Sequence, residues 1–168
     1  MSGDYFGKFR GTVVQNVDPQ QMGRIQAIVP STTNVIPTTW AMPCVPFTGR
    51  QSGVFVVPAI GSAVWIEYEQ GDLDYPIWTG GFWGSAAEVP AIALAGNPLS
   101  PSIVLQSGLG NSITISDLPG PAGGIQIKSA GGAAILVNET GITITNGAAT
   151  IVLAGPTVTI NNGALAVT

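Results

Sequence analysis

Four acidic residues lie close together in the sequence, and their types and spacing are those that could do chemistry. Glu67 and Glu69 lie two residues apart and share one face of a predicted strand, and Asp72 and Asp74 follow in the next loop. Paired carboxylates carry out glycoside hydrolysis, but the two members come from separate elements that face each other across the substrate. We therefore expect these four residues to form a solvated strand face followed by an Asx-type turn.

The same acidic group contains the residues that could bind a metal ion. Asp72 and Asp74 offer oxygen atoms at alternate positions and are the candidates for a Ca²⁺ site, although the rest of an EF-hand loop is missing. The sequence has no histidine and one cysteine, Cys44, which excludes a zinc site or a Cys–His nucleophile within one chain. We expect no cofactor and no enzymatic activity.

The elements that carry these residues belong to a chain whose two halves differ in composition. Every aromatic residue lies between Tyr5 and Trp83, whereas the second half is rich in Gly, Ala, Ile, Val, Leu, Ser, Thr and Asn. A half that poor in charge stays soluble when partner chains cover its apolar faces, so it is predicted to be an obligate assembly element. Its only charged residues are Glu88, Asp117, Lys128 and Glu139.

The first half shows the alternation of short β-strands. Val64, Ile66 and Tyr68 form one face of a strand whose other face is polar, and Ile25, Ala27 and Val29 repeat this pattern. No segment shows a sustained helical period, so a small Greek-key barrel of the OB type is predicted over residues 1–84. Further strands are expected over residues 5–16, 53–57 and 77–83.

Apolar pairs two residues apart recur in the second half and predict one short strand each. The pairs start 7 to 12 residues apart, and Gly, Asn, Asp or Pro fills most gaps, which is typical of a β-helix or solenoid over residues 102–168. Residues 85–101, with three prolines, are predicted to be a linker. The predicted core residues are Ile113, Ile115, Ile125, Ile127, Ile135, Val137, Ile142, Ile144, Ile151, Leu153, Val158 and Ile160.

A single chain of such short strands cannot close its own core. Three identical chains wound together would send alternate side chains to a shared axis and satisfy one another's backbone groups. The sequence therefore predicts an all-β protein, with an N-terminal OB-like β-barrel followed by an intertwined trimeric β-helix needle.

One stretch of the first half resembles a known family. Residues 11–25, GTVVQNVDPQQMGRI, are similar to the opening of the phage baseplate assembly protein V family, whose domain is shared with VgrG-type spikes. The later stretches PAIG (58–61), VWI (64–66), EQGD (69–72), YP (75–76) and GGFW (80–83) resemble that family in the same order. The resemblance covers residues 5–84, and in style the repeats after residue 102 match the family's triple-stranded β-helix.

The resemblance implies a structural role. Members of this family are central spikes of contractile tails, which dock as homotrimers on a separate hub protein in the virion baseplate, or in a bacterial injection particle, and contact the target membrane on contraction. Some end in a His-x-His iron site, which a chain without histidine cannot form. Either the last coil of the chain is then the point, or a separate PAAR-like tip protein caps it at the C-terminal end. We expect the cap, because it would cover unpaired strand edges.

Two alternatives remain open at this point. A trimeric OB-fold binding module for glycan or nucleic acid would use Trp40, Trp65, Trp78 and Trp83 to stack on its ligand. The net charge of −4 argues against nucleic acid, which is bound by clustered Lys and Arg. A β-helical tailspike hydrolase would need carboxylates along the needle, where only Asp117 and Glu139 are available.

Overall fold

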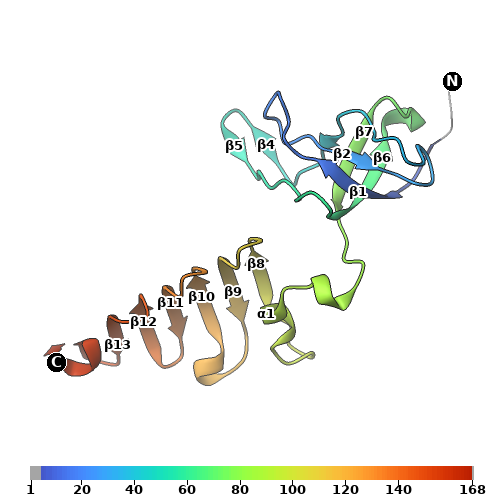
Figure 1. The fold of residues 1–168 in the computed structure, drawn as a ribbon. Coiled ribbons are helices and arrows are strands. Elements are labelled where there is room, and N and C mark those ends of the chain that lie inside the picture. The colour runs from blue at the N-terminus through green and yellow to red at the C-terminus, as the bar shows by residue number, and fades with distance from the viewer. Residues whose placement is uncertain (1–4, 168) are drawn as a thin grey trace. The chain divides into compact units, whose positions relative to one another are not determined.

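The computed structural model describes residues 5–167, and the chain divides into two compact units, Met1–Ala86 and Ala87–Thr168. Both units are built from β-strands (Figure 1), and the helical elements are short 3₁₀ turns and the four-residue helix α1 (Ala91–Leu94). We call the first unit the head and the strands β8–β15 of the second unit the needle sheet.

The head contains a five-stranded sheet in the order β2-β1-β6-β7-β3, with the β4–β5 hairpin separate from it. Strand β1 pairs antiparallel with β2 and β6, β6 and β7 form an antiparallel pair, and β3 runs parallel to β7. The strands are β1 (Phe9–Gln15), β2 (Gln26–Ile28), β3 (Met42–Pro43), β4 (Thr48–Gly49), β5 (Ser52–Gly53), β6 (Ala63–Tyr68) and β7 (Pro76–Gly81).

The core of the head follows the alternation in the sequence. Val64, Ile66 and Tyr68 of β6 are buried while the residues between them are half-buried, as predicted. The face around β2 is buried in the same way, which confirms the second predicted strand face. The buried apolar residues are Val13, Ile25, Ala27, Val29, Ala41, Val64, Ile66, Tyr68 and Trp78.

Two local predictions in the head are wrong. Residues 53–57 were expected to form a strand, but β5 ends at Gly53, and Val54 makes a single backbone hydrogen bond, from its N–H to the Phe47 carbonyl at 3.3 Å. Glu69 was expected to share a strand face with Glu67. Strand β6 instead ends at Tyr68, because Gln70 adopts φ 51° in the 3₁₀ turn Glu69–Gly71 and turns the chain out of the sheet.

The needle sheet has eight strands in the order of the sequence, each antiparallel to its neighbours. The backbone partner of each strand is the adjacent strand of the same chain, whereas the needle expected from the sequence has chains that satisfy one another's backbone groups. The strands are β8 (Ile103–Gln106), β9 (Ser112–Ser116), β10 (Gly124–Lys128), β11 (Ala134–Asn138), β12 (Gly141–Thr145), β13 (Thr150–Ala154), β14 (Thr157–Ile160) and β15 (Leu165–Val167).

Tight turns explain why neighbouring strands pair. Between β11 and β12 only two residues intervene, and the Asn138 side-chain oxygen accepts a hydrogen bond from the Thr140 N–H at 2.9 Å. Gly141 then begins β12 at φ 138°, a backbone conformation that is essentially restricted to glycine. Connections this short return the chain beside the strand it has just left, which produces a hairpin.

Candidate functional site

The needle sheet has one face whose side chains are apolar from end to end. Paired strands bring these residues into register, so that Ile115 lies opposite Ile125 and Ile125 lies opposite Val137. The result is two parallel rows that run across the strands, which together we call the apolar face. One row contains Ile103, Ile115, Ile125, Val137, Ile142, Leu153 and Val158; the other contains Leu105, Ile113, Ile127, Ile135, Ile144, Ile151, Ile160 and Leu165.

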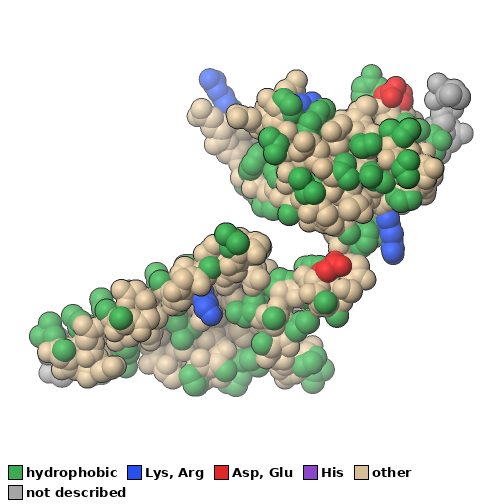
Figure 2. Space-filling model, in the orientation of Figure 1, with side chains coloured by type: hydrophobic (Ala, Val, Ile, Leu, Met, Phe, Trp, Pro, Cys, Tyr) green, Lys and Arg blue, Asp and Glu red, His purple; other side chains and the backbone are tan. Residues whose placement is uncertain are grey.

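All twelve predicted core residues lie on this apolar face. Nine of them are exposed in one chain, with exposed fractions from 37% for Leu153 to 50% for Ile127, and the other three, Ile142, Val158 and Ile160, are half-buried. Figure 2 shows apolar side chains at the surface of both units. The largest apolar patch on a monomeric protein is typically about 300–600 Å². Two continuous rows of Ile, Val and Leu, one across seven strands and the other across eight, therefore indicate a surface that another molecule covers.

The opposite face of the needle sheet is more polar and, at one end, better covered. Ser112 and Thr114 of β9 are 7% and 8% exposed. Ile92 and Ala95, from helix α1 and the residue after it, line a cavity of about 180 Å³ together with Thr114 and Leu136. The Thr114 hydroxyl has no hydrogen-bond partner. In one chain, then, threonine is buried while isoleucine is exposed, the reverse of the arrangement in a monomeric soluble protein.

Two acidic residues of the head, Glu67 and Asp72, make hydrogen bonds within the head. Glu67 accepts a hydrogen bond from the Lys8 ammonium at 2.9 Å, and Lys8 also donates to the Thr79 hydroxyl at 3.0 Å. Asp72 accepts the Asp74 N–H at 3.0 Å, which is the expected Asx-type turn. Among residues 5–167, no three His, Cys, Asp or Glu side chains gather where they could hold a metal ion. The Ca²⁺ candidates Asp72 and Asp74 thus have no third ligand of this kind in the described chain.

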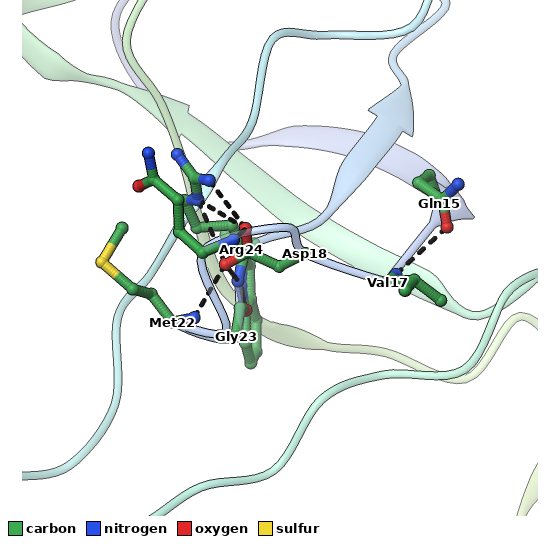
Figure 3. Close-up of polar contacts among 8 residues, drawn as sticks. Gln15, Val17, Asp18, Met22, Gly23 and Arg24 are labelled. Atoms are coloured by element: carbon green, nitrogen blue, oxygen red, sulfur yellow. Dashed lines mark hydrogen bonds and ion pairs between the residues drawn. The ribbon is translucent and has the colours of Figure 1, made fainter.

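The turn between β1 and β2 holds a partly buried ion pair that the sequence pattern did not predict (Figure 3). Arg24 Nη2 donates to Asp18 Oδ1 at 2.7 Å, and Arg24 Nε also contacts the carboxylate. The same carboxylate accepts the backbone N–H groups of Gln20 at 2.9 Å, Met22 at 2.8 Å and Arg24 at 3.3 Å. Asp18-Pro19 is a turn signal in the sequence, but a turn signal does not reveal which side chain will satisfy the backbone of the turn.

Hydrogen bonding dominates the electrostatics of this turn. The Arg24 guanidinium holds the pKa of Asp18 well below its ordinary range, assisted by the three backbone donors and opposed by desolvation. The carboxylate in turn raises the pKa of Arg24. The Arg24 guanidinium carbon also lies 5.5 Å from the ring centroid of Trp40. Both oxygens of the Asp18 carboxylate accept hydrogen bonds from groups of the turn, so the pair stabilises the turn.

Two family comparisons cover most of the chain in its own order. Residues 9–83 match the type VI secretion system/phage-baseplate injector OB domain. Residues 102–166 match the phage baseplate V C-terminal trimerisation domain. The chain belongs to the phage baseplate V family of spike proteins. No curated protein matches the chain significantly.

The baseplate V matches coincide with the two elements described above. The OB-domain match spans β1–β7, and the trimerisation-domain match begins just before β8 and reaches into β15. The apolar face therefore lies on a trimerisation domain. Among the residues that the structure describes, no helix has the length and apolar character needed to cross a bilayer.

Proposed function

We propose that this baseplate V protein is a non-enzymatic structural subunit of the central spike of a contractile injection apparatus, and that it works as a homotrimer. The observation that carries the proposal is the apolar face, two in-register rows of Ile, Val and Leu that one chain leaves uncovered on a domain matched as a trimerisation domain. Three copies related by a threefold axis would each turn this face inward and bury it.

Inward packing of three sheets gives the needle its mechanical properties. Each strand is already hydrogen-bonded to its neighbours within its own chain, so the contacts between chains are side-chain contacts along the two apolar rows. The expected needle is then a three-sided prism of meandering sheets. Its stiffness comes from continuous backbone ladders inside each chain and from a dry apolar core between chains.

In this role the head docks on a separate hub protein, and the needle is pushed into the target envelope when the sheath contracts. A PAAR-like protein at the C-terminal end would cover the outer edge of β15, because an unpaired strand edge recruits other strands. The family matches support a component of a phage or type VI baseplate. Docking, piercing and the tip partner are parts of this proposal.

The alternatives have less support. A hydrolase of the tailspike kind needs free carboxylates along the needle, but Glu139 accepts the Gly120 N–H at 2.8 Å and sits in the turn between β11 and β12. A binding module for nucleic acid would need clustered basic residues, whereas the chain has five Lys or Arg against nine Asp or Glu.

The proposal is tested first by the solution mass of the full chain, measured by light scattering. A mass of three 17.1 kDa chains is expected, and a monomer would overturn it. The second test is electron microscopy of purified contractile particles with a gold-labelled antibody against the chain. Label at the baseplate supports the spike role. If the chain is a trimer but is absent from the particles, the spike role is overturned and trimerisation stands.

A further inference from the structure

The head carries an open apolar groove beside β7. Its volume is about 560 Å³, and its walls include Cys44, Val45, Val54, Val56 and Trp78. None of the residues that line it is charged. One wall is the irregular segment after β5, in which Val56 is 66% exposed. The residues predicted as a strand therefore form the side of a groove, and their apolar character is left facing solvent.

The same head also exposes an apolar projection. Val35 and Ile36 are consecutive residues in the loop between β2 and β3, and their exposed fractions are 73% and 67%. The loop is held in shape from within, because the Ile36 N–H donates to the Thr33 carbonyl at 3.1 Å and the Thr33 hydroxyl donates to the Ile36 carbonyl at 2.7 Å. A preformed loop loses little conformational entropy when it is bound.

A second copy of the chain is the occupant that these features favour. The head is covalently joined to a trimerisation domain, so every groove has two other heads at high effective concentration. A groove and a projection on one molecule make a head-to-tail contact, which closes into a ring when the rotation between copies is that of the threefold axis. Apolar groove and apolar loop also match in chemistry, with no charge to desolvate.

We propose that the groove of each head receives the Val35–Ile36 loop of a neighbouring copy, so that three heads close into a ring. This contact rests on trimerisation by the needle sheet, as in the proposed function, but it is a separate interface. It also assigns a use to the apolar segment Val54–Val57, which pairs with no strand of the described chain.

The single cysteine of the chain makes the proposal testable, because Cys44 lines the groove and is exposed in one copy. The rate of maleimide labelling of Cys44 is measured in the full-length wild type, in Ile36→Ser and in Val17→Ser. Val17 is the matched control, since it is 74% exposed and lies in the turn after β1. Light scattering on the same samples reports the trimer, and near-UV circular dichroism reports the fold of the head alone, which holds every aromatic residue.

Wild type and Val17→Ser are expected to label about tenfold more slowly than Ile36→Ser, because access to a covered thiol requires local opening, while all three stay trimeric. Equal rates in a trimeric wild type and a trimeric Ile36→Ser would overturn the contact and leave the needle trimer standing. Fast labelling of the isolated wild-type trimer would overturn it as well and point to the hub as the occupant. A monomeric wild type would overturn trimerisation and this contact together. If Ile36→Ser loses its near-UV signal, Val35→Ser replaces it.

Discussion

The indole Nε1 of Trp78 donates a hydrogen bond of 3.1 Å to the carbonyl oxygen of Gly23 and so joins β7 to the turn before β2. That turn contains Asp18 and Arg24. Their ion pair and the Arg24 N–H, which donates to the Asp18 carboxylate, stabilise the turn internally. Trp78 is also a member of the buried core. The position of the turn is thus fixed both by the core of the head and by its own carboxylate.

Replacing Trp78 by Phe should lower the free energy of unfolding of the head by about 1–3 kcal/mol, because the Gly23 carbonyl would be left without its donor in a buried place. The change is measured by chemical denaturation followed by near-UV circular dichroism. Trp83→Phe is the control, since Trp83 is 62% exposed, and it should change stability little. Equal effects of the two variants would contradict a structural role for the indole N–H.

The stability of the head should depend on pH through Asp18. Its folded-state pKa is depressed below the ordinary value of 3.8, so its contribution is fully present above that value and is lost progressively as the pH falls toward the folded-state pKa. Thermal melts of wild type and Asp18→Asn at several pH values check this. The variant should melt at a lower temperature at pH 7, and the difference should shrink below about pH 4. A constant difference across this range would contradict the assignment.

Neighbouring residues of β12 point to opposite faces of the needle sheet and test which face is inside the trimer. Ile144→Asp should dissociate the trimer, because three unpaired carboxylates would meet in an apolar core. Thr143→Asp places the same charge on the opposite face and should leave the trimer intact. Light scattering separates the two results. Dissociation by Thr143→Asp alone would show that the faces are assigned the wrong way round.

The first residue of β12 must be glycine. A Cβ at Gly141 would collide with the Leu153 carbonyl, at a φ of 138°. Gly132, with φ 94°, has open space around its Cβ position, so Gly132→Ala carries backbone strain only, on the order of 1–2 kcal/mol. Gly141→Ala should destabilise the needle by clearly more, as measured by far-UV circular dichroism during thermal unfolding. Similar losses in both variants would mean that the sheet can shift to make room.

Alternation along a strand could be predicted from the sequence because it depends on local side-chain chemistry. Ile25 and Ala27 of the head, and Ile125 and Ile127 of the needle, share faces as their spacing indicates. In the needle, the pairing of each strand with its neighbour in the same chain was not predicted. Gaps as short as the two residues between Asn138 and Gly141 do favour hairpins, and this was the available signal for pairing within the chain.

The periodicity of the sequence predicts neither the apolar groove of the head nor the Asp18–Arg24 ion pair. Val54 and Val56 are apolar and two residues apart, like a strand face, but Pro58 follows closely and no neighbouring strand offers its backbone. Arg24 lies six positions after Asp18, and the two side chains meet because the turn between them brings the chain back. A pattern in a single sequence does not determine that geometry. Both features depend on tertiary contacts, which the structure supplies.

Every strand of the needle sheet pairs only with its neighbours in sequence, so the length of the needle depends on the number of its hairpins. The seven strand-to-strand intervals of the needle sheet, at about 4.8 Å each, span roughly 34 Å. Duplication or loss of one hairpin would change that span by about 10 Å and extend or shorten both apolar rows in register. In the proposed spike role, the number of hairpins would set how far the needle reaches, with no change to the head.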